Sequence, residues 1–412
     1  MANAVEHERA AAGPAAALRL IGHRNFGPYF IGNASSATGT WFQNLAASLF
    51  VYRHTHSPFL LGVLQFATFI PVLVLAPWAG SAADRFDRRR LVLWSQLCAT
   101  ALAALLAGLA WAGLAPVAVV IAVSLGLGVV SAFSAPAAQA LIADLVPREE
   151  IQSAVALNSM TYNLARAVGP ALAALSVRKL GIPASFAINS GSYLVLVAGV
   201  LLVQPAVREF ARRGEASLRE SLRLLRAQPH LLGFLLIVTA VGFGSDPINT
   251  ESPAFAHVFH RPDTDAGYVI GAFGAGAVLA AFALAGRTAG TRRRMATTLT
   301  MLGLGVIGFA VSPWLGLGFV FLAFAGFGYL ASNTHATSRL QLDVDIGQRG
   351  RIMALWSVAF LGLRPIASLT DGAIAGAFGV RAAGVVLALP ALAAAGAIHF
   401  LQRRNRTLTF QA

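Results

Sequence analysis

The sequence predicts an all-α integral membrane protein, and three observations carry this prediction. Apolar residues make up 57% of the 412 residues and charged residues only 12%, a composition unlike that of soluble domains. The apolar residues form runs of about twenty, the length of a helix that crosses the hydrocarbon core of a bilayer. The basic residues lie between these runs, mostly on one side of the predicted membrane.

Twelve apolar runs can be delimited, six in each half of the chain. They are 26–52, 59–79, 91–113, 117–141, 152–177, 184–203, 231–252, 266–285, 295–311, 315–338, 352–376 and 382–401. Proline removes a backbone donor and clashes with the preceding turn. We therefore expect Pro170 and Pro365 to interrupt the long fifth and eleventh helices.

The distribution of lysine and arginine predicts the topology. If both ends of the chain are cytoplasmic, 24 of the 31 basic residues lie inside and five outside, and Arg166 and Arg364 lie within spans. This is the asymmetry that the positive-inside rule describes. It also explains the net charge of +14 without nucleic acid as a partner. The N-terminus shows no cleavable signal pattern and is predicted to be a cytoplasmic tail.

The loop between the second and third spans carries a charged motif. Gly80, Asp84, Arg85, Arg88 and Arg89 follow the pattern Gly-x3-Asp-Arg-x2-Arg-Arg. The pattern resembles the signature loop of the major facilitator superfamily, although Asp87 stands where that family often has glycine. The resemblance implies that the loop braces the two helix bundles on the cytoplasmic side and breaks and reforms during transport. The alternative is a solvated loop that only sets topology.

An internal repeat supports two related halves. Val155–Ser159, Arg166 and Leu180–Ile182 recur 198 residues later as Met353–Ser357, Arg364 and Phe378–Val380. The fifth and eleventh helices are therefore predicted symmetry mates. The loop around Gly290 resembles a degraded copy of the motif, with Gly290 in place of Asp84.

The resemblance extends from Arg24 to Gln402 and implies the major facilitator fold, with twelve transmembrane helices in two six-helix bundles. The implied parts are a cytoplasmic N-tail (1–25), an N-terminal bundle (26–203), a cytoplasmic central loop (204–228), a C-terminal bundle (229–402) and a cytoplasmic C-tail (403–412).

Three runs, at 134–147, 163–170 and 349–354, are most similar to the bacterial efflux branch that includes enterobactin exporters and macrolide-efflux proteins. Arg166, Gly169 and Pro170 resemble the fifth-helix Gly-Pro motif of exporters and antiporters, although alanines replace its other glycines.

Polar residues within spans are the candidates for substrate or coupling sites, because charges in lipid are costly and face the bundle interior. Arg166 and Arg364, near mid-membrane, either meet the substrate or brace neighbouring helices. The other candidates are Asn33, Asn44, Asn158, Tyr162, Asp246, His335, Trp356 and Asp371. No acidic residue lies deep in the first six spans, so proton coupling would use Asp246, Asp371, Glu251 or His335.

The predicted function is secondary active export of a small organic molecule across the bacterial inner membrane, by alternating access and with proton antiport. An uptake permease or uniporter is the alternative. The short central loop disfavours a membrane sensor, and the missing catalytic motifs disfavour an intramembrane enzyme. We expect a monomer that binds a small-molecule substrate, protons and lipid. We expect no nucleic acid, cofactor or metal, and the single cysteine, Cys98, permits no intramolecular disulfide.

Overall fold

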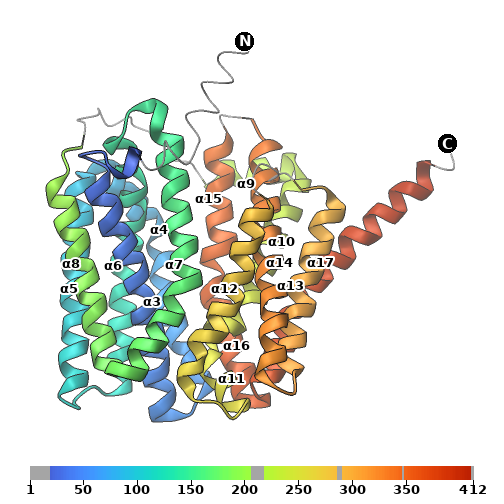
Figure 1. The fold of residues 1–412 in the computed structure, drawn as a ribbon. Coiled ribbons are helices and arrows are strands. Elements are labelled where there is room, and N and C mark those ends of the chain that lie inside the picture. The colour runs from blue at the N-terminus through green and yellow to red at the C-terminus, as the bar shows by residue number, and fades with distance from the viewer. Residues whose placement is uncertain (1–18, 206–217, 285–289, 346–347, 410–412) are drawn as a thin grey trace. The chain divides into compact units, whose positions relative to one another are not determined.

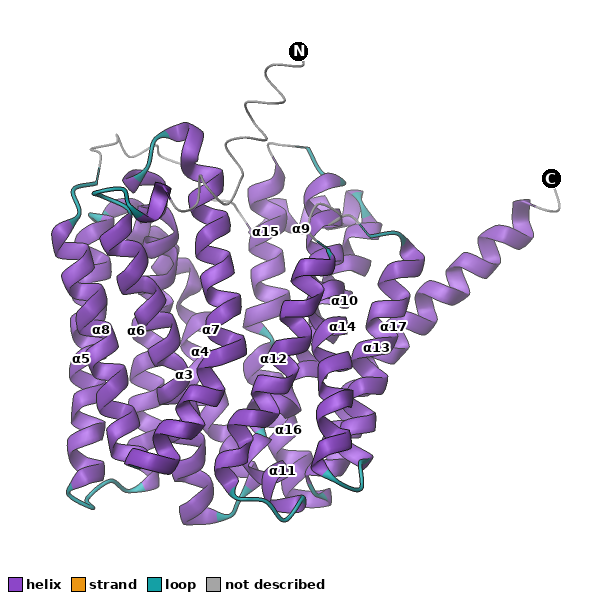
Figure 2. Ribbon diagram, viewed as in Figure 1, coloured by secondary structure: helices purple, strands orange, loops and turns teal. Residues whose placement is uncertain are grey.

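The computed structural model describes residues 19–205, 218–284, 290–345 and 348–409. Throughout these ranges the regular elements are helices and no strand occurs (Figures 1 and 2), so the all-helical class is confirmed. The predicted N-terminal tail up to residue 18, most of the central loop (206–217), residues 285–289 before Gly290 and the last three residues of the C-tail lie outside the described residues.

The contacts divide the chain into two units. The first contains Met1–Ala47 and Val74–Arg212, and the second contains Ser48–Leu73 and Arg213–Ala412. The end of α3 and the first half of α4 therefore belong to the second unit, although the sequence placed them in the N-terminal bundle. The predicted domain boundaries stay a prediction.

Six long helices carry the first half of the chain. They are α3 (Gly27–Thr55), α4 (Pro58–Arg85), α5 (Arg88–Trp111), α6 (Val117–Leu145), α7 (Ile151–Leu180) and α8 (Ile182–Leu202). In the first unit α5 packs against both α6 and α8 (Figure 1). α7 is one continuous helix with Pro170 inside it, so the predicted interruption is wrong there. Membrane helices tolerate proline where local adjustment satisfies the freed carbonyl.

The second half contains both long and short helices. They are α9 (Leu218–Ala227), α10 (Pro229–Thr250), α11 (Ser252–Val258), α12 (Ala266–Ala283), α13 (Arg292–Val311), α14 (Leu315–Leu342), α15 (Arg349–Ser357), α16 (Arg364–Phe378) and α17 (Val380–Thr409). The predicted interruption at Pro365 is confirmed, because a π-helical turn, Val358–Gly362, separates α15 from α16. Pro365 lies in the first turn of α16. A backbone N–H at this position has no acceptor within the helix, so proline loses no helical hydrogen bond there.

Ten helices of the described residues are long and apolar enough to cross a membrane. α3 and α7 are not among the ten, and both carry polar residues that are candidates from the sequence, such as Asn33 and Asn158. The multi-pass membrane character is therefore established, and the count of twelve spans stays a prediction.

The internal repeat is visible in the backbone. Gly181 ends α7 with φ +87° and Gly379 ends α16 with φ +87°. A side chain is rarely accommodated at this φ, so glycine is the favoured residue at both bends. The two positions are 198 residues apart, as the repeat predicts.

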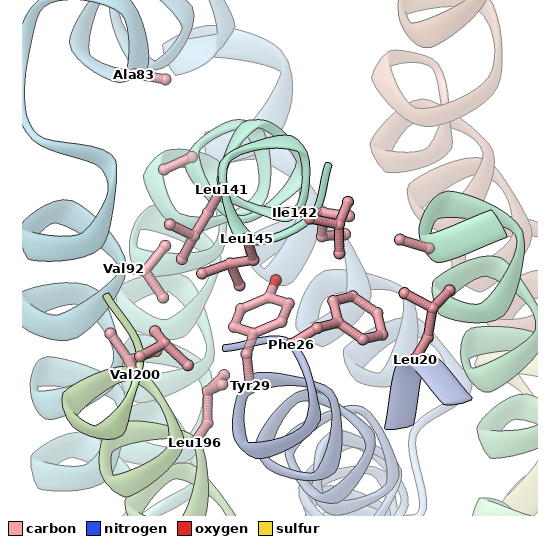
Figure 3. Close-up of a cluster of buried hydrophobic side chains, with 14 residues drawn as sticks. Leu20, Phe26, Tyr29, Ala83, Val92, Leu141, Ile142, Leu145, Leu196 and Val200 are labelled. Atoms are coloured by element: carbon pink, nitrogen blue, oxygen red, sulfur yellow. The ribbon is translucent and has the colours of Figure 1, made fainter. Parts of the chain in front are cut away.

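A buried cluster fixes the start of α3 in the first unit (Figure 3). Phe26 and Tyr29 pack with Leu141 and Leu145 of α6 and with Leu196 of α8. The Tyr29 hydroxyl donates to the carbonyl of Ala138 at 3.2 Å, so the polar tip of this buried ring has a partner.

Within the second unit, α4 and α16 meet backbone to backbone. A Cβ atom on Gly62 would lie 2.6 Å from the Ser368 carbonyl oxygen, and one on Gly372 would lie 2.9 Å from the Gly62 Cα. The ion pair between Arg53 and Asp263 joins the end of α3 to the segment before α12, with an Nη2–Oδ1 distance of 2.9 Å. Small residues allow this close helix packing, and the segment Ser48–Leu73 thereby covers α16.

We expect Gly372→Val to lower the thermal stability of the purified protein in detergent. The new side chain meets backbone atoms that cannot rotate away, and such overpacking costs about 1–3 kcal/mol. Gly396→Val in α17 is the matched control, because Gly396 has open space around its Cβ position. Equal melting temperatures for the two variants would contradict the close contact.

Candidate functional site

The second unit contains an ion pair between a buried acid, Asp246, and Arg364, whose side chain is 21% exposed. Asp246 of α10 is 1% exposed, and the Nε atom of Arg364 lies 3.9 Å from its Oδ1 atom. Thr250 donates to Oδ2 at 2.9 Å and Ser368 donates to Oδ1 at 3.0 Å. Opposite charge and hydroxyl donors both favour an ionised carboxylate. Asp246 is therefore the anion of this pair.

Local structure places Arg364 at this point. The π-helical turn before α16 shifts the helix register, and the Thr239 hydroxyl donates to the Ala359 carbonyl within the turn at 3.2 Å. The guanidinium lies over the ring of Phe69, 4.2 Å from its centroid. A cation over an aromatic face is stabilised electrostatically, so Phe69 is a partner of Arg364 that the sequence did not indicate.

Two further carboxyl groups lie near this pair. Glu251, directly after α10, and Asp371 of α16 are both 0% exposed. None of their four oxygens has a hydrogen-bond partner within the described residues. Asp371 lies two turns after Arg364 on α16, and Arg364 forms an ion pair with Asp246 of α10.

The first unit presents amides in place of acids. Asn33 of α3 donates to Asn158 of α7 at 2.6 Å, so two of the predicted candidates contact each other. Arg166 and Asn44 are half-buried, and Tyr162 is 55% exposed.

The Gly-Pro motif positions α7 against α3. Gly169 packs on Trp41, whose side-chain atoms lie 2.8–2.9 Å from the position of an added Cβ. Gly169 and Pro170 are both buried, so in the first unit this motif makes a close helix contact.

Two further candidates, Trp356 and His335, have contacts of their own in the second unit. Trp356 stacks on Phe360 at 5.1 Å between ring centroids, and its indole nitrogen has no hydrogen-bond partner in the ranges described. His335 is buried against Gly290, where an added Cβ would lie 2.4 Å from the imidazole ring. This contact explains why the degraded motif has glycine in place of the aspartate.

The charged motif of the first unit uses its residues in different ways. Asp84 is exposed in the last turn of α4, and Asp87 instead caps α5 by accepting from the Arg90 amide at 3.0 Å. Asp87, and not Asp84 of the motif, therefore caps the N-terminus of α5. Gly80 has open space around it, and Arg85 is exposed.

Two arginines of the motif tie α5 to its neighbours. Arg88 forms an ion pair with Asp144 of α6 at 2.8 Å. Arg89 donates to the carbonyls of Val200 and Leu201 at 2.9 and 2.8 Å, which satisfies free carbonyls at the end of α8. Sequence reasoning missed Asp144 as the partner, although an acid at the end of a span near a basic loop was an available signal.

Comparison with solved structures defines the class of fold. A bacterial homologue of the human lysosomal transporter Spinster, in an inward-facing and unoccupied conformation, matches with a TM-score of 0.72 over 92% of this chain and 96% of that chain, at 16% identity. At this identity the likeness shows the fold alone.

The family follows from the sequence comparison. The chain belongs to the transmembrane secretion effector family of the major facilitator superfamily, whose model matches residues 15–408. Members are transporters and not enzymes.

Three relatives give the range of the family. The multidrug efflux pump Tap of Mycolicibacterium fortuitum is 27% identical over 90% of this chain and 93% of that protein. The enterobactin exporter EntS of Shigella flexneri is 25% identical over 89% and 92%. The Staphyloferrin A transporter of Staphylococcus aureus is 29% identical, but the match spans only 39% of this chain and 40% of that protein.

A double-mutant cycle tests the buried pair. We expect Arg364→Gln and Asp246→Asn each to lower the unfolding free energy, and the double variant to lower it by less than their sum, with a coupling of about 1–3 kcal/mol. The control cycle uses Arg90 and Asp87, which are 4.0 Å apart with side chains 81% and 55% exposed, where coupling should be near zero. Equal coupling energies in the two cycles would show that burial of Asp246 does not strengthen its interaction with Arg364.

Proposed function

We propose that the protein exports a small organic molecule across the bacterial inner membrane by alternating access, with proton antiport as the driving reaction. We also propose that the chain has twelve spans in two six-helix bundles and that both termini are cytoplasmic. The names of Tap and EntS, both efflux or export proteins matched over about nine tenths of this chain, support the direction. The observation that carries the coupling is the buried Asp246–Arg364 pair beside two unpaired carboxyl groups.

The proposed roles follow from chemistry and position. Arg166, Tyr162 and Asn44 are exposed or half-buried in the first unit, so they can meet a substrate that has carbonyl, hydroxyl or anionic groups. Asn33 and Asn158 position α3 against α7. Arg364 and Asp246 form a charge pair whose partners change during coupling.

The charged motif is the proposed conformational loop. Asp84 is exposed, which leaves its carboxylate available in another conformation of the transporter. Arg88 and Arg89 hold α5 within the first unit in this structure. The protein acts in this proposal as a monomer, without cofactor and without nucleic acid.

Export is tested in cells that lack their own major efflux pumps. We expect expression of the protein to lower the accumulation of at least one compound in a panel of erythromycin, ethidium, tetracycline and catecholate siderophore. Arg166→Gln should reduce that efflux at least about tenfold, equivalent to 1.4 kcal/mol, at an unchanged melting temperature. Arg178→Gln, an exposed position at the end of α7, is the matched control.

The outcomes separate the alternatives. Greater accumulation of a compound on expression would support the uptake permease over the exporter. Normal efflux by Arg166→Gln would end the role of this arginine in substrate handling, and a parallel loss of folding and efflux would make it a brace between helices.

The topology is tested by cysteine labelling in a Cys98→Ser background. We expect an impermeant thiol reagent applied to intact cells to label Pro262→Cys but not Glu149→Cys, because the basic residues place Glu149 on the cytoplasmic side. Both positions are exposed in the structure, so accessibility within the protein does not limit the reaction. The reverse pattern would invert the proposed topology.

A further inference from the structure

Three carboxyl groups share one buried region of the second unit with Arg364. Asp246 is 1% exposed, and Glu251 and Asp371 are 0% exposed. Asp371 and Asp246 are close enough to Glu251 for electrostatic interaction, and Asp246 also acts on Asp371. Arg364 pairs with Asp246. One guanidinium cannot balance three carboxylates in this setting.

The hydrogen bonds distinguish the three groups. Asp246 receives two hydroxyl donors, from Thr250 and Ser368. Both oxygens of Glu251 and both of Asp371 receive none from the described residues, and the buried hydroxyl of Ser252 beside Glu251 is also without a partner. An ionised carboxylate without donors or a cation is costly to bury, and a group in this position takes up a proton instead.

A metal ion fits this region less well than protons do. No group of three His, Cys, Asp or Glu side chains that could hold a metal ion occurs in the part of the chain that the structure describes. Proton uptake needs no convergence of ligands, because each carboxyl binds its own proton at one oxygen.

The segment Ser48–Leu73 closes this region within the second unit. Gly62 contacts Ser368 and Gly372 on either side of Asp371, and Phe69 covers Arg364. Tyr52 lies within electrostatic reach of Glu251, and its ring is 6.2 Å from that of His257 between centroids. The other charged groups of the neighbouring elements are Arg53 and Asp263, which pair with each other, Arg261 and Asp265, which also pair, and Arg381 over Phe259.

We propose that Glu251 and Asp371 are the proton-binding site of this transporter. Each holds one proton on a carboxyl oxygen while Ser48–Leu73 covers α16, and Asp246 stays ionised beside Arg364. When the cover withdraws, water reaches the two groups, each O–H bond breaks, and the protons pass to water with the carboxylates left ionised. The inference rests on the proposed function, because it takes protons as the coupling ion. It adds the two residues that carry the protons and a capacity of two protons per transporter.

The test detects protonated carboxyl groups directly, without a transported substrate. The purified full chain in lipid is measured by infrared spectroscopy near neutral pH, in H2O and after transfer to D2O. A protonated carboxyl gives a carbonyl stretch that shifts to lower frequency in D2O, and a carboxylate does not. We expect this band in the wild type, about half of it in Glu251→Gln and in Asp371→Asn, and none in the double variant.

Two controls locate the protons. Asp246→Asn should retain the band, because Asp246 is the ionised member of the cluster. Glu149 is an exposed acid in the turn before α7, and Glu149→Gln should retain the band as well. A band that persists in the double variant, or one that disappears in Asp246→Asn alone, would overturn the assignment.

The melting temperature and the response of the band to sodium give independent readouts. Glutamine and asparagine match the shape of protonated carboxyls, so neither single variant should melt below Glu149→Gln. Loss of folding in both would mean that the charges are required, and a band that falls as NaCl replaces choline chloride would make the site a sodium site. Either result overturns the proposal. If the band is present but a pH gradient drives no efflux, proton antiport is refuted and the assignment of Glu251 and Asp371 stands. If a pH gradient drives efflux but the band is absent, the assignment is refuted and proton antiport stands.

Discussion

The interaction on which the second unit depends is the ion pair between Arg364 and the buried Asp246. Away from water, a charge must be paired and hydrogen-bonded, and removing one partner of such a pair costs roughly 3–5 kcal/mol. The chain meets this requirement with two hydroxyl donors to Asp246 and an aromatic face against Arg364. The π-helical turn and Pro365 are the local departures from regular helix that precede this arginine. A strained or irregular segment thus coincides with the charged site, as it often does in membrane transporters.

The two halves share a backbone plan and differ in chemistry. The bends at Gly181 and Gly379 have the same φ angle, and Arg166 and Arg364 occupy matching positions of the repeat. The residues that match Ser368 and Asp371 in the first half are Pro170 and Ala173, which can neither donate to a carboxylate nor bind a proton. The acidic region is therefore confined to one half, and the first unit offers amides and an arginine instead.

Close helix contact and buried charge are linked in this structure. Gly62 and Gly372 let α4 approach α16 until backbone atoms touch, and this contact lies one residue from Asp371. The same segment, Ser48–Leu73, begins in α3 and ends in α4, whose remaining residues belong to the first unit. Movement of this segment would change the water exposure of Asp371, because Gly62 packs against Ser368 and Gly372 on either side of it.

The sequence by itself determined the helical class, the membrane setting, the family and the break at Pro365, and it named Arg364, Asp246 and Asp371 as candidates. Composition, local proline chemistry and the cost of charge in lipid are properties of short stretches, so they can be read from the chain alone. Only the tertiary structure decided that α7 continues through Pro170, that Asp246 rather than Asp371 pairs with Arg364, and that Arg88 pairs with Asp144. Partners on different helices depend on the rotation and approach of those helices, which small residues such as Gly62 and Gly372 set through packing that no local pattern specifies.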